Sequence, residues 1–181
     1  MAPTEVLKHE HQVVLRVLEA AEKEVASSRK HGTVHVTLVR EMVDFFRGFV
    51  DRCHHTKEEK HLFARMHEQG MPFDSGPLAV MLHDHEQGRA CIRAIMEALP
   101  EEGEPDAEAA ARIANHLSAY ISLLRAHIDK EDNVLYPMAD RLLSRADDET
   151  LTAAFERVEA EEMGEGMHER YHEWVHKLTH S

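Results

Sequence analysis

Residues 113–138 read IANHLSAYISLLRAHIDKEDNVLYPM, and this stretch decides the fold. Its apolar residues recur at steps of three and four, which places them along one face of an α-helix. The predicted stripe consists of Ile113, Leu117, Tyr120, Leu124, His127, Glu131, Val134 and Met138. Two of its members, His127 and Glu131, are polar, although the other residues of this face are apolar and suited to a buried core. A buried side chain of this kind needs a partner there.

The rest of the chain repeats this helical pattern. We expect helices over roughly 4–29, 33–68, 77–99 and 106–145, with Gly and Pro gathered at the breaks, and a C-terminal part from about 148 with Asp147 or Asp148 as its N-cap. Pro137 falls inside the last long helix and should kink or locally break it. Four amphipathic helices with short connections predict an all-α fold, an antiparallel up-down-up-down four-helix bundle with a C-terminal helical extension. The expected domains are the bundle, residues 1–146, and the extension, residues 147–181, packed on the bundle.

Polar residues interrupt the apolar stripe of every helix. The first and third helices each place one histidine there, and the second and fourth each place a histidine and a glutamate four residues apart, a spacing that puts both on one face. The six residues are His11, His55, Glu59, His85, His127 and Glu131. A buried carboxylate is costly unless it is paired or bound to a metal.

These six residues predict a metal site in the core of the bundle. A lone histidine on an apolar stripe is more often a hydrogen-bonded core residue, so the prediction rests on the coincidence of four helices. Imidazoles and carboxylates together suit iron, manganese or zinc better than calcium or magnesium. Two carboxylates on facing helices could each bridge two ions.

The motifs around these residues resemble those of the hemerythrin-like family, the HHE cation-binding domains. The motifs are KHEH at 8–11, CHHTKEEKHLF at 53–63, DHEQGR at 84–89 and HIDKEDNVLYP at 127–137, and the resemblance covers about residues 4–145. It implies a four-helix bundle around an oxo- or hydroxo-bridged centre of two iron ions that reacts with O2 or related small molecules. Zinc or manganese could substitute for iron. By the family pattern, all six residues fall on ligand positions.

Two departures separate this chain from the oxygen-carrying hemerythrins. The carriers have a histidine four residues before the one that matches His85, where this chain has Met81. Their last carboxylate follows five residues after the histidine, which would select Asp132, although Glu131 fits the stripe better. Glu58 is a candidate for the vacancy left by the missing imidazole. A more open site favours reaction or sensing over reversible oxygen transport.

Several other residues near the site have open roles. Glu10, Asp84 and Asp129 could hydrogen-bond ligating imidazoles from outside. Tyr120 could reach into the pocket or be a plain core aromatic residue. His54 and His83 neighbour ligand positions, but we expect both to make surface or local contacts.

The C-terminal residues carry a ladder of histidines at four-residue steps, namely His168, His172, His176 and His180. Its HERYH and HEWVH segments match the HExxH zinc-protease pattern, but the third ligand that this class requires is missing. We expect Tyr171, Trp174, Val175 and Leu178 to pack on the bundle and the ladder to face solvent. The alternative is that His168 or His172, with Glu161, Glu162 or Glu165, caps the open end of the metal site.

Composition narrows the function further. The chain has 181 residues, 16 histidines, two cysteines and a net charge of −13, an acidic balance that argues against nucleic acid. No apolar run approaches the ~18 residues of a membrane span, and no signal peptide is visible. We therefore expect a soluble, cytoplasmic protein whose ligand is a small diatomic molecule or peroxide, with a protein partner left open.

Three functions remain as hypotheses. The first is a di-iron protein that binds O2, peroxide or NO in the response to oxygen, iron or oxidative stress. The second is a di-iron enzyme with catalase- or peroxidase-like turnover. The third is a metal-free helical interaction protein, which the cost of burying unpaired glutamates disfavours.

Overall fold

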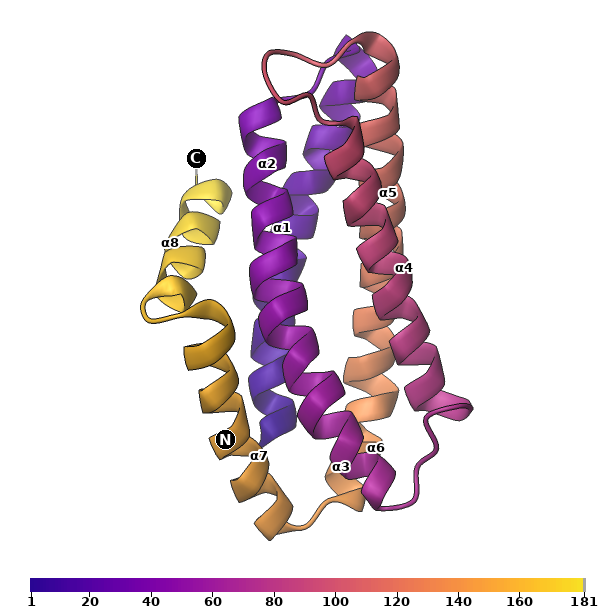
Figure 1. The fold of residues 1–181 in the computed structure, drawn as a ribbon, viewed down its shortest axis with the longest axis vertical. Helices are drawn as coiled ribbons and strands as arrows, with labels where there is room; N and C mark the ends of the chain where they lie inside the picture. Colours follow the sequence, from indigo (N-terminus) through magenta and orange to yellow (C-terminus); the bar gives the residue numbers. More distant parts are fainter. Residues whose placement is uncertain (181) are drawn as a thin grey trace.

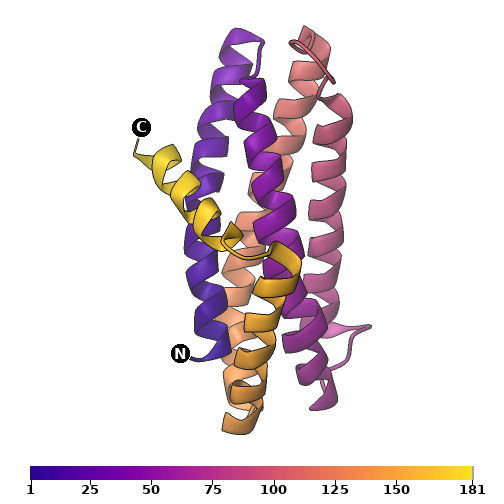
Figure 2. The ribbon, with the colours of Figure 1, turned by 60° about the vertical axis from the view of Figure 1, so that its left-hand side comes forward.

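Four long helical stretches run alternately up and down the molecule, and two further helices lie along one side (Figures 1 and 2). The computed structural model describes residues 1–180. Its elements in order are α1 (Pro3–His31), α2 (Val36–Phe45), η1 (Phe46–His55), η2 (Lys57–Leu62), α3 (Phe63–Glu68), α4 (Gly76–Ala98), α5 (Ala107–Lys130), η3 (Glu131–Leu135), α6 (Tyr136–Leu142), α7 (Arg145–Val158), η4 (Glu159–Met163) and α8 (Met167–Thr179), where η marks π-helical turns.

The predicted fold class is confirmed. The first stretch is α1, the second runs without a break from α2 to α3, the third is α4, and the fourth runs from α5 to α6. Each predicted helix boundary lies within a few residues of the observed one. No strand occurs between residues 1 and 180. Ser181, the last residue of the predicted extension, lies outside the described residues.

Wide π-helical turns correct the predicted stripes in the second and fourth stretches. In these turns the backbone bonds i to i+5, so the buried face shifts by about one residue. Val134 was predicted in the stripe but is 53% exposed, whereas Leu135 and Tyr136 are buried. Pro137 does not break the helix, because it sits in the first turn of α6, directly after η3.

The apolar core consists of two clusters. The larger contains the aromatic residues Phe45, Phe46 and Phe49 and packs the half of the bundle with the α1–α2 turn. The smaller contains Leu7 and Leu78, among others, at the opposite end. Buried polar residues occupy the level between the two clusters.

The C-terminal helices lie against the first two stretches of the bundle (Figure 2). The N-cap of α7 is Ser144, whose side chain accepts a hydrogen bond from the N–H of Asp147, while the Asp147 carboxylate accepts from the N–H of Ser144. The predicted N-cap was therefore three or four residues too late. Tyr171 and Val175 of α8 are buried, and the Tyr171 hydroxyl donates to the Asp44 carboxylate.

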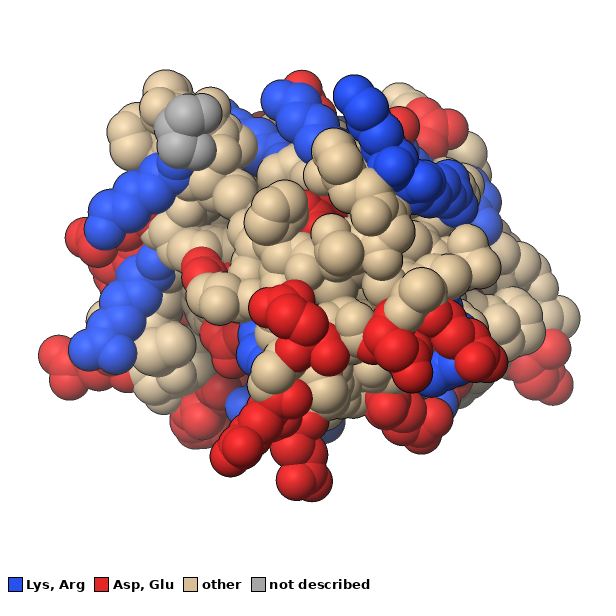
Figure 3. Space-filling view, turned by 90° about the horizontal axis from the view of Figure 1, so that it is seen from above, with Lys and Arg blue, Asp and Glu red and all other residues tan. Residues whose placement is uncertain are grey.

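Charged side chains are unevenly spread at the end of the bundle that carries the α1–α2 and α4–α5 turns. In that view Lys and Arg lie mainly along one edge and Asp and Glu along the opposite one (Figure 3).

Among the described residues, no helix combines the length and the apolar character needed to cross a membrane. The cytoplasmic location stays a prediction.

Candidate metal centre

Five imidazoles and two carboxylates meet at the polar level between the two apolar clusters. α1, α4 and α5 each supply one histidine, η1 supplies two, and η2 and η3 each supply one glutamate. In chain order they are His11, His54, His55, Glu58, His85, His127 and Glu131, and none is more than 5% exposed. We call these seven residues the centre.

One side of the centre is formed by His55, Glu58, His85 and His127, whose ligand atoms lie within 4.8 Å of one another. The Nε2 atoms of His85 and His127 are 3.2 Å apart. Nε2 of His85 is 3.4 Å from Oε1 of Glu58. The ring of His55 stacks on that of His85 at 3.7 Å between centroids.

The other side is formed by His11, His54 and Glu131. The two Nε2 atoms are 3.1 Å apart, and Oε1 of Glu131 is 3.3 Å from Nε2 of His11. The same oxygen lies 2.8 Å from Nε2 of His127 on the first side. Oε1 of Glu58 is likewise 3.4 Å from Nε2 of His54. Both carboxylates therefore border both groups of imidazoles.

Three oxygens of these carboxylates are buried without a hydrogen bond, namely Oε1 of Glu58 and both oxygens of Glu131. The two Oε1 atoms lie 2.8–3.4 Å from imidazole Nε2 atoms. Leaving buried acceptors unsatisfied is costly. Two ligand atoms at about 2.1 Å from one metal ion and at right angles are about 3.0 Å apart, close to the spacings observed. The residues present therefore fit metal ions held between them.

Each imidazole is held from outside by a carboxylate. The Nδ1 contacts are His11 to Asp132 at 2.7 Å, His54 to Glu10 at 2.9 Å, His55 to Asp51 at 3.2 Å, His85 to Glu59 at 2.9 Å and His127 to Asp84 at 3.1 Å. A carboxylate on Nδ1 keeps the proton there and leaves the Nε2 lone pair free for a metal. Such an outer ring of carboxylates is the usual support for metal-binding histidines.

Burial and neighbouring charges shift the pKa values of the two buried carboxylates and of His11. Burial raises the pKa of Glu58, and the nearby Glu131 raises it further. Burial also opposes the charge of Glu131, but His127, Glu58 and His11 together outweigh it and hold the pKa of that carboxyl well below its usual range. For His11, burial would lower the pKa, but the carboxylates of Asp132 and Glu131 raise it to about 9. A bound cation would replace such protons as the partner of the carboxylates.

The structure brings five of the six predicted residues into the centre, all except Glu59. The Glu59 side chain is 26% exposed and accepts from Arg89 at 2.5 Å and from His85. Glu58, the predicted alternative, takes the inner place. The π-helical turns of η1 and η2 are the reason, because they turn Glu58 inward.

Sequence reasoning missed His54, which was expected at the surface or in a local contact. The signal was present in the sequence, because His54 and Glu58 have the same four-residue spacing as His55 and Glu59. His83, the other neighbour considered, is exposed.

A tyrosine does reach the centre, but it is Tyr136 and not Tyr120. The Tyr136 hydroxyl donates to Oε2 of Glu58 at 2.8 Å and lies 3.4 Å from Nε2 of His11. Tyr120 packs on Phe46 instead, at 4.6 Å between ring centroids.

Among the acidic neighbours, Glu10 and Asp84 contact imidazoles as considered from the sequence. Asp129 does not, because it accepts from Asn133 at the surface.

The C-terminal extension approaches the centre only through outer residues. Nε2 of His168 lies 4.0 Å from Glu10 and 3.9 Å from Glu159. The ammonium group of Lys57, which is fully buried, sits between those two carboxylates at 2.6 and 2.7 Å. The glutamates considered as caps, Glu161, Glu162 and Glu165, are exposed, as is His172.

Comparisons with known proteins agree with this geometry. The model of the hemerythrin HHE cation-binding domain matches residues 2–139. Three similar proteins, two from Mycobacterium tuberculosis and one from Mycobacterium bovis, are each 23% identical over 164 residues, and each is described as uncharacterized. The match covers 91% of this chain but only 63% of each relative. No solved structure matches the chain.

Proposed function

The chain belongs to the hemerythrin HHE cation-binding domain family, and we propose that it is a non-heme di-iron protein that binds O2, peroxide or NO. Its role would be in the response to oxygen, iron or oxidative stress. The observation that carries the proposal is the pair of buried carboxylates, with three unpartnered oxygens between two groups of inward-facing imidazoles.

The residues divide naturally between two ions. His11 and His54 would hold one ion, and His55, His85 and His127 the other. Glu58 and Glu131 would be shared, because each carboxylate borders both groups of imidazoles. When bound, two iron ions would supply the redox chemistry and the exchangeable positions that such a ligand needs. The outer carboxylates would keep the imidazoles in place throughout.

Tyr136 favours reaction or sensing over oxygen transport. Its hydroxyl lies beside Glu58 and His11, so the chain keeps a proton donor at the edge of the centre. The histidine missing at Met81 gives no further support for reaction or sensing. It does not leave the centre short of imidazoles, because η1 contributes two and the centre has five in all.

The test is the metal content and near-ultraviolet spectrum of protein purified aerobically, followed by addition of peroxide. We expect about two irons per chain and their loss in a His127→Ala/Glu131→Ala double variant. The matched control is Asp129→Ala/Asn133→Ala, an exposed pair at the same spacing in the same helical stretch. Iron that is absent from the wild type, or unchanged in the first variant, would overturn the proposal.

The response to peroxide separates the binding or sensing protein from the enzyme. Slow bleaching of the spectrum without turnover supports a protein that binds or senses its ligand. Rapid evolution of O2 would instead establish the catalase-like alternative, which uses the same centre.

A further inference from the structure

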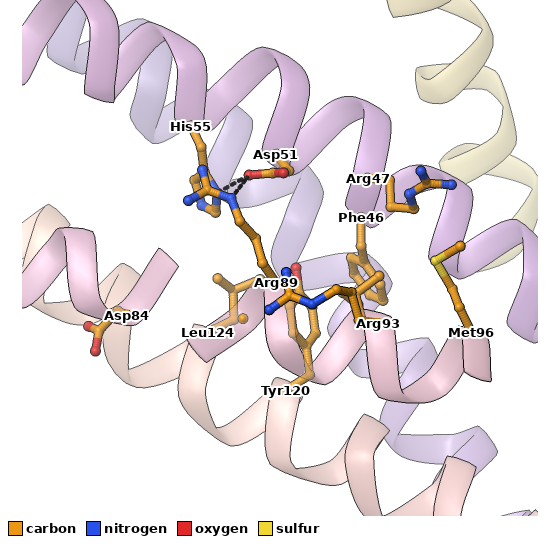
Figure 4. A pocket seen from close by; sticks show the side chains of 12 residues that line it. Phe46, Arg47, Asp51, His55, Asp84, Arg89, Arg93, Met96, Tyr120 and Leu124 are labelled. Atoms are coloured by element: carbon orange, nitrogen blue, oxygen red, sulfur yellow. Dashed lines mark hydrogen bonds and ion pairs between the residues drawn. The ribbon is translucent and has the colours of Figure 1, made fainter. Parts of the chain in front are cut away.

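A pocket of about 250 Å³ opens between η1, α4 and α5, and His55 of the centre lies in its wall (Figure 4). Its apolar walls come from Phe46, Ile92, Met96 and Leu124. Apolar walls with a few polar groups are typical of pockets for small organic molecules.

The charges around this pocket are mostly neutralised by one another. Arg89 crosses it to reach Asp51 at 2.8 Å and Glu59 at 2.5 Å (Figure 4). The remaining carboxylate of the lining, Asp84, is paired with Lys130 and His127. None of these groups is left to attract a ligand.

Two arginines of the lining remain unpaired. Arg47 of η1 and Arg93 of α4 are exposed, and neither makes an ion pair or hydrogen bond with any residue from 1 to 180. Guanidinium groups bind carboxylates through two parallel hydrogen bonds. The mouth of the pocket is therefore cationic, while its interior is apolar.

One polar group in the interior is also free. Tyr120 lines the pocket and is 3% exposed, yet its hydroxyl makes no hydrogen bond within the described part of the chain. The ring is buried in the wall, while the hydroxyl borders the pocket. This group can accept or donate a hydrogen bond to an occupant.

We propose that this pocket binds a small organic monocarboxylate with a compact apolar body. The carboxylate lies at the mouth, bound by Arg47 or by Arg93, whose guanidinium groups point apart (Figure 4). The apolar body lies among Phe46, Ile92 and Leu124. The inference goes beyond the metal centre and does not depend on the identity of the metal. The two sites share His55, so an occupant lies next to the imidazole that stacks on His85.

The test uses isothermal calorimetry on the full chain with benzoate, benzyl alcohol and benzylamine, which share an apolar body and differ in charge. We expect one benzoate per chain, bound about tenfold or more tighter than the alcohol, and no binding of the amine. Equal affinity for all three probes would overturn the proposal.

Variants locate the binding. Arg47→Gln/Arg93→Gln should reduce the affinity for benzoate to that for the alcohol, and both positions are exposed, so the fold should tolerate the change. Arg52→Gln, an exposed arginine of the same η1 outside the pocket, should leave it unchanged. Benzoate binding that survives the double variant would contradict the site.

The iron content of each sample is measured in parallel. Arginine-dependent binding of benzoate to protein without iron would support the pocket while contradicting the proposed function.

Discussion

Each imidazole of the centre contacts a carboxylate through Nδ1, and this contact fixes the orientation of the ring. The five outer carboxylates come from α1, η1, η2, α4 and η3, so every helical stretch of the bundle takes part. Because the ring orientation is fixed by these contacts, the ligand atoms need little rearrangement to accept an ion.

His54 tests the ligand assignment at the level of single residues. His54→Ala should weaken iron binding by about tenfold or more, because it removes one of the two imidazoles on its side of the centre. His83→Ala is the matched control, since this histidine is exposed and lies off the centre. Iron titrations followed by absorbance compare the two, and equal affinities would exclude His54 as a ligand.

The sequence predicted most of these residues but not the correct register in the second stretch. His54 with Glu58 and His55 with Glu59 have identical spacing, so periodicity alone cannot choose between the pairs. An ideal α-helix would separate the two pairs by about 100°. The π-helical turns bring His54, His55 and Glu58 inward together, and periodicity does not reveal such turns.

At the level of the elements, the contact of α8 with η1 depends on Gly48. A Cβ atom at this position would lie 2.1 Å from the Tyr171 hydroxyl oxygen, so a larger residue fits only if the Tyr171 side chain moves. At Gly88 of α4 the nearest atom would be 3.4 Å away, an ordinary contact.

Gly48→Ala should therefore destabilise the protein by about 1–3 kcal/mol and loosen α8. Gly88→Ala should be neutral or stabilising by about 0.5–1 kcal/mol, because alanine favours a helix over glycine. Urea denaturation measures the difference, and limited proteolysis shows whether the segment before α8 becomes accessible. Equal stability of the two variants would contradict the observed packing.

The start of α7 gives a pH-dependent contribution to stability. Hydrogen bonds from Ser144 and the nearby Arg65 lower the pKa of Asp147 from its ordinary value of 3.8. A lowered pKa means that the stabilisation is present above the unfolded pKa and is lost as the pH falls through the folded one.

Asp147→Asn should accordingly destabilise the protein at neutral pH, and the difference from wild type should shrink in acid. Asp148→Asn is the control, since burial and the nearby Asp140 raise the pKa of Asp148. This second variant should not lose stability at neutral pH. Denaturation curves at pH 7 and pH 3 test both expectations. A loss that is equally large at both values would contradict the role of the charge.

Across the whole molecule, one buried cation joins the bundle to its C-terminal extension. Lys57 contacts Glu10 of α1 and Glu159 of η4, and Glu10 in turn holds His54. Burial would lower the pKa of Lys57, but its neighbours, chiefly the carboxylates of Glu10 and Glu159, together outweigh this and raise it. The ammonium group thus remains charged in a site without exposure to solvent.

Lys57→Met should cost about 3 kcal/mol, the lower end of the range for breaking a buried ion pair, because Glu159 is 36% exposed. The matched control is Lys60→Met, at an exposed position of the same η2. Chemical denaturation compares the free energies of unfolding. Equal values would show that the link contributes nothing to stability.

The sequence predicted the bundle because three-and-four periodicity in four segments leaves few other ways to bury the apolar faces. It did not predict the link to the extension. Lys57 lies in a run of charged residues, KEEK, and nothing in its spacing marks one lysine as buried. Its partner Glu159 is 102 residues away, a contact that only the packed structure defines.

The most direct test of the metal centre compares Glu58→Gln with Glu59→Gln. Each protein is loaded with ferrous iron without oxygen, desalted and analysed for iron per chain. The structure predicts about two irons in the wild type and in Glu59→Gln, since glutamine can still accept from His85. It predicts less than one in Glu58→Gln, which loses the carboxylate bordering both groups of imidazoles. Two irons retained by Glu58→Gln, or their loss from Glu59→Gln alone, would contradict the proposed centre.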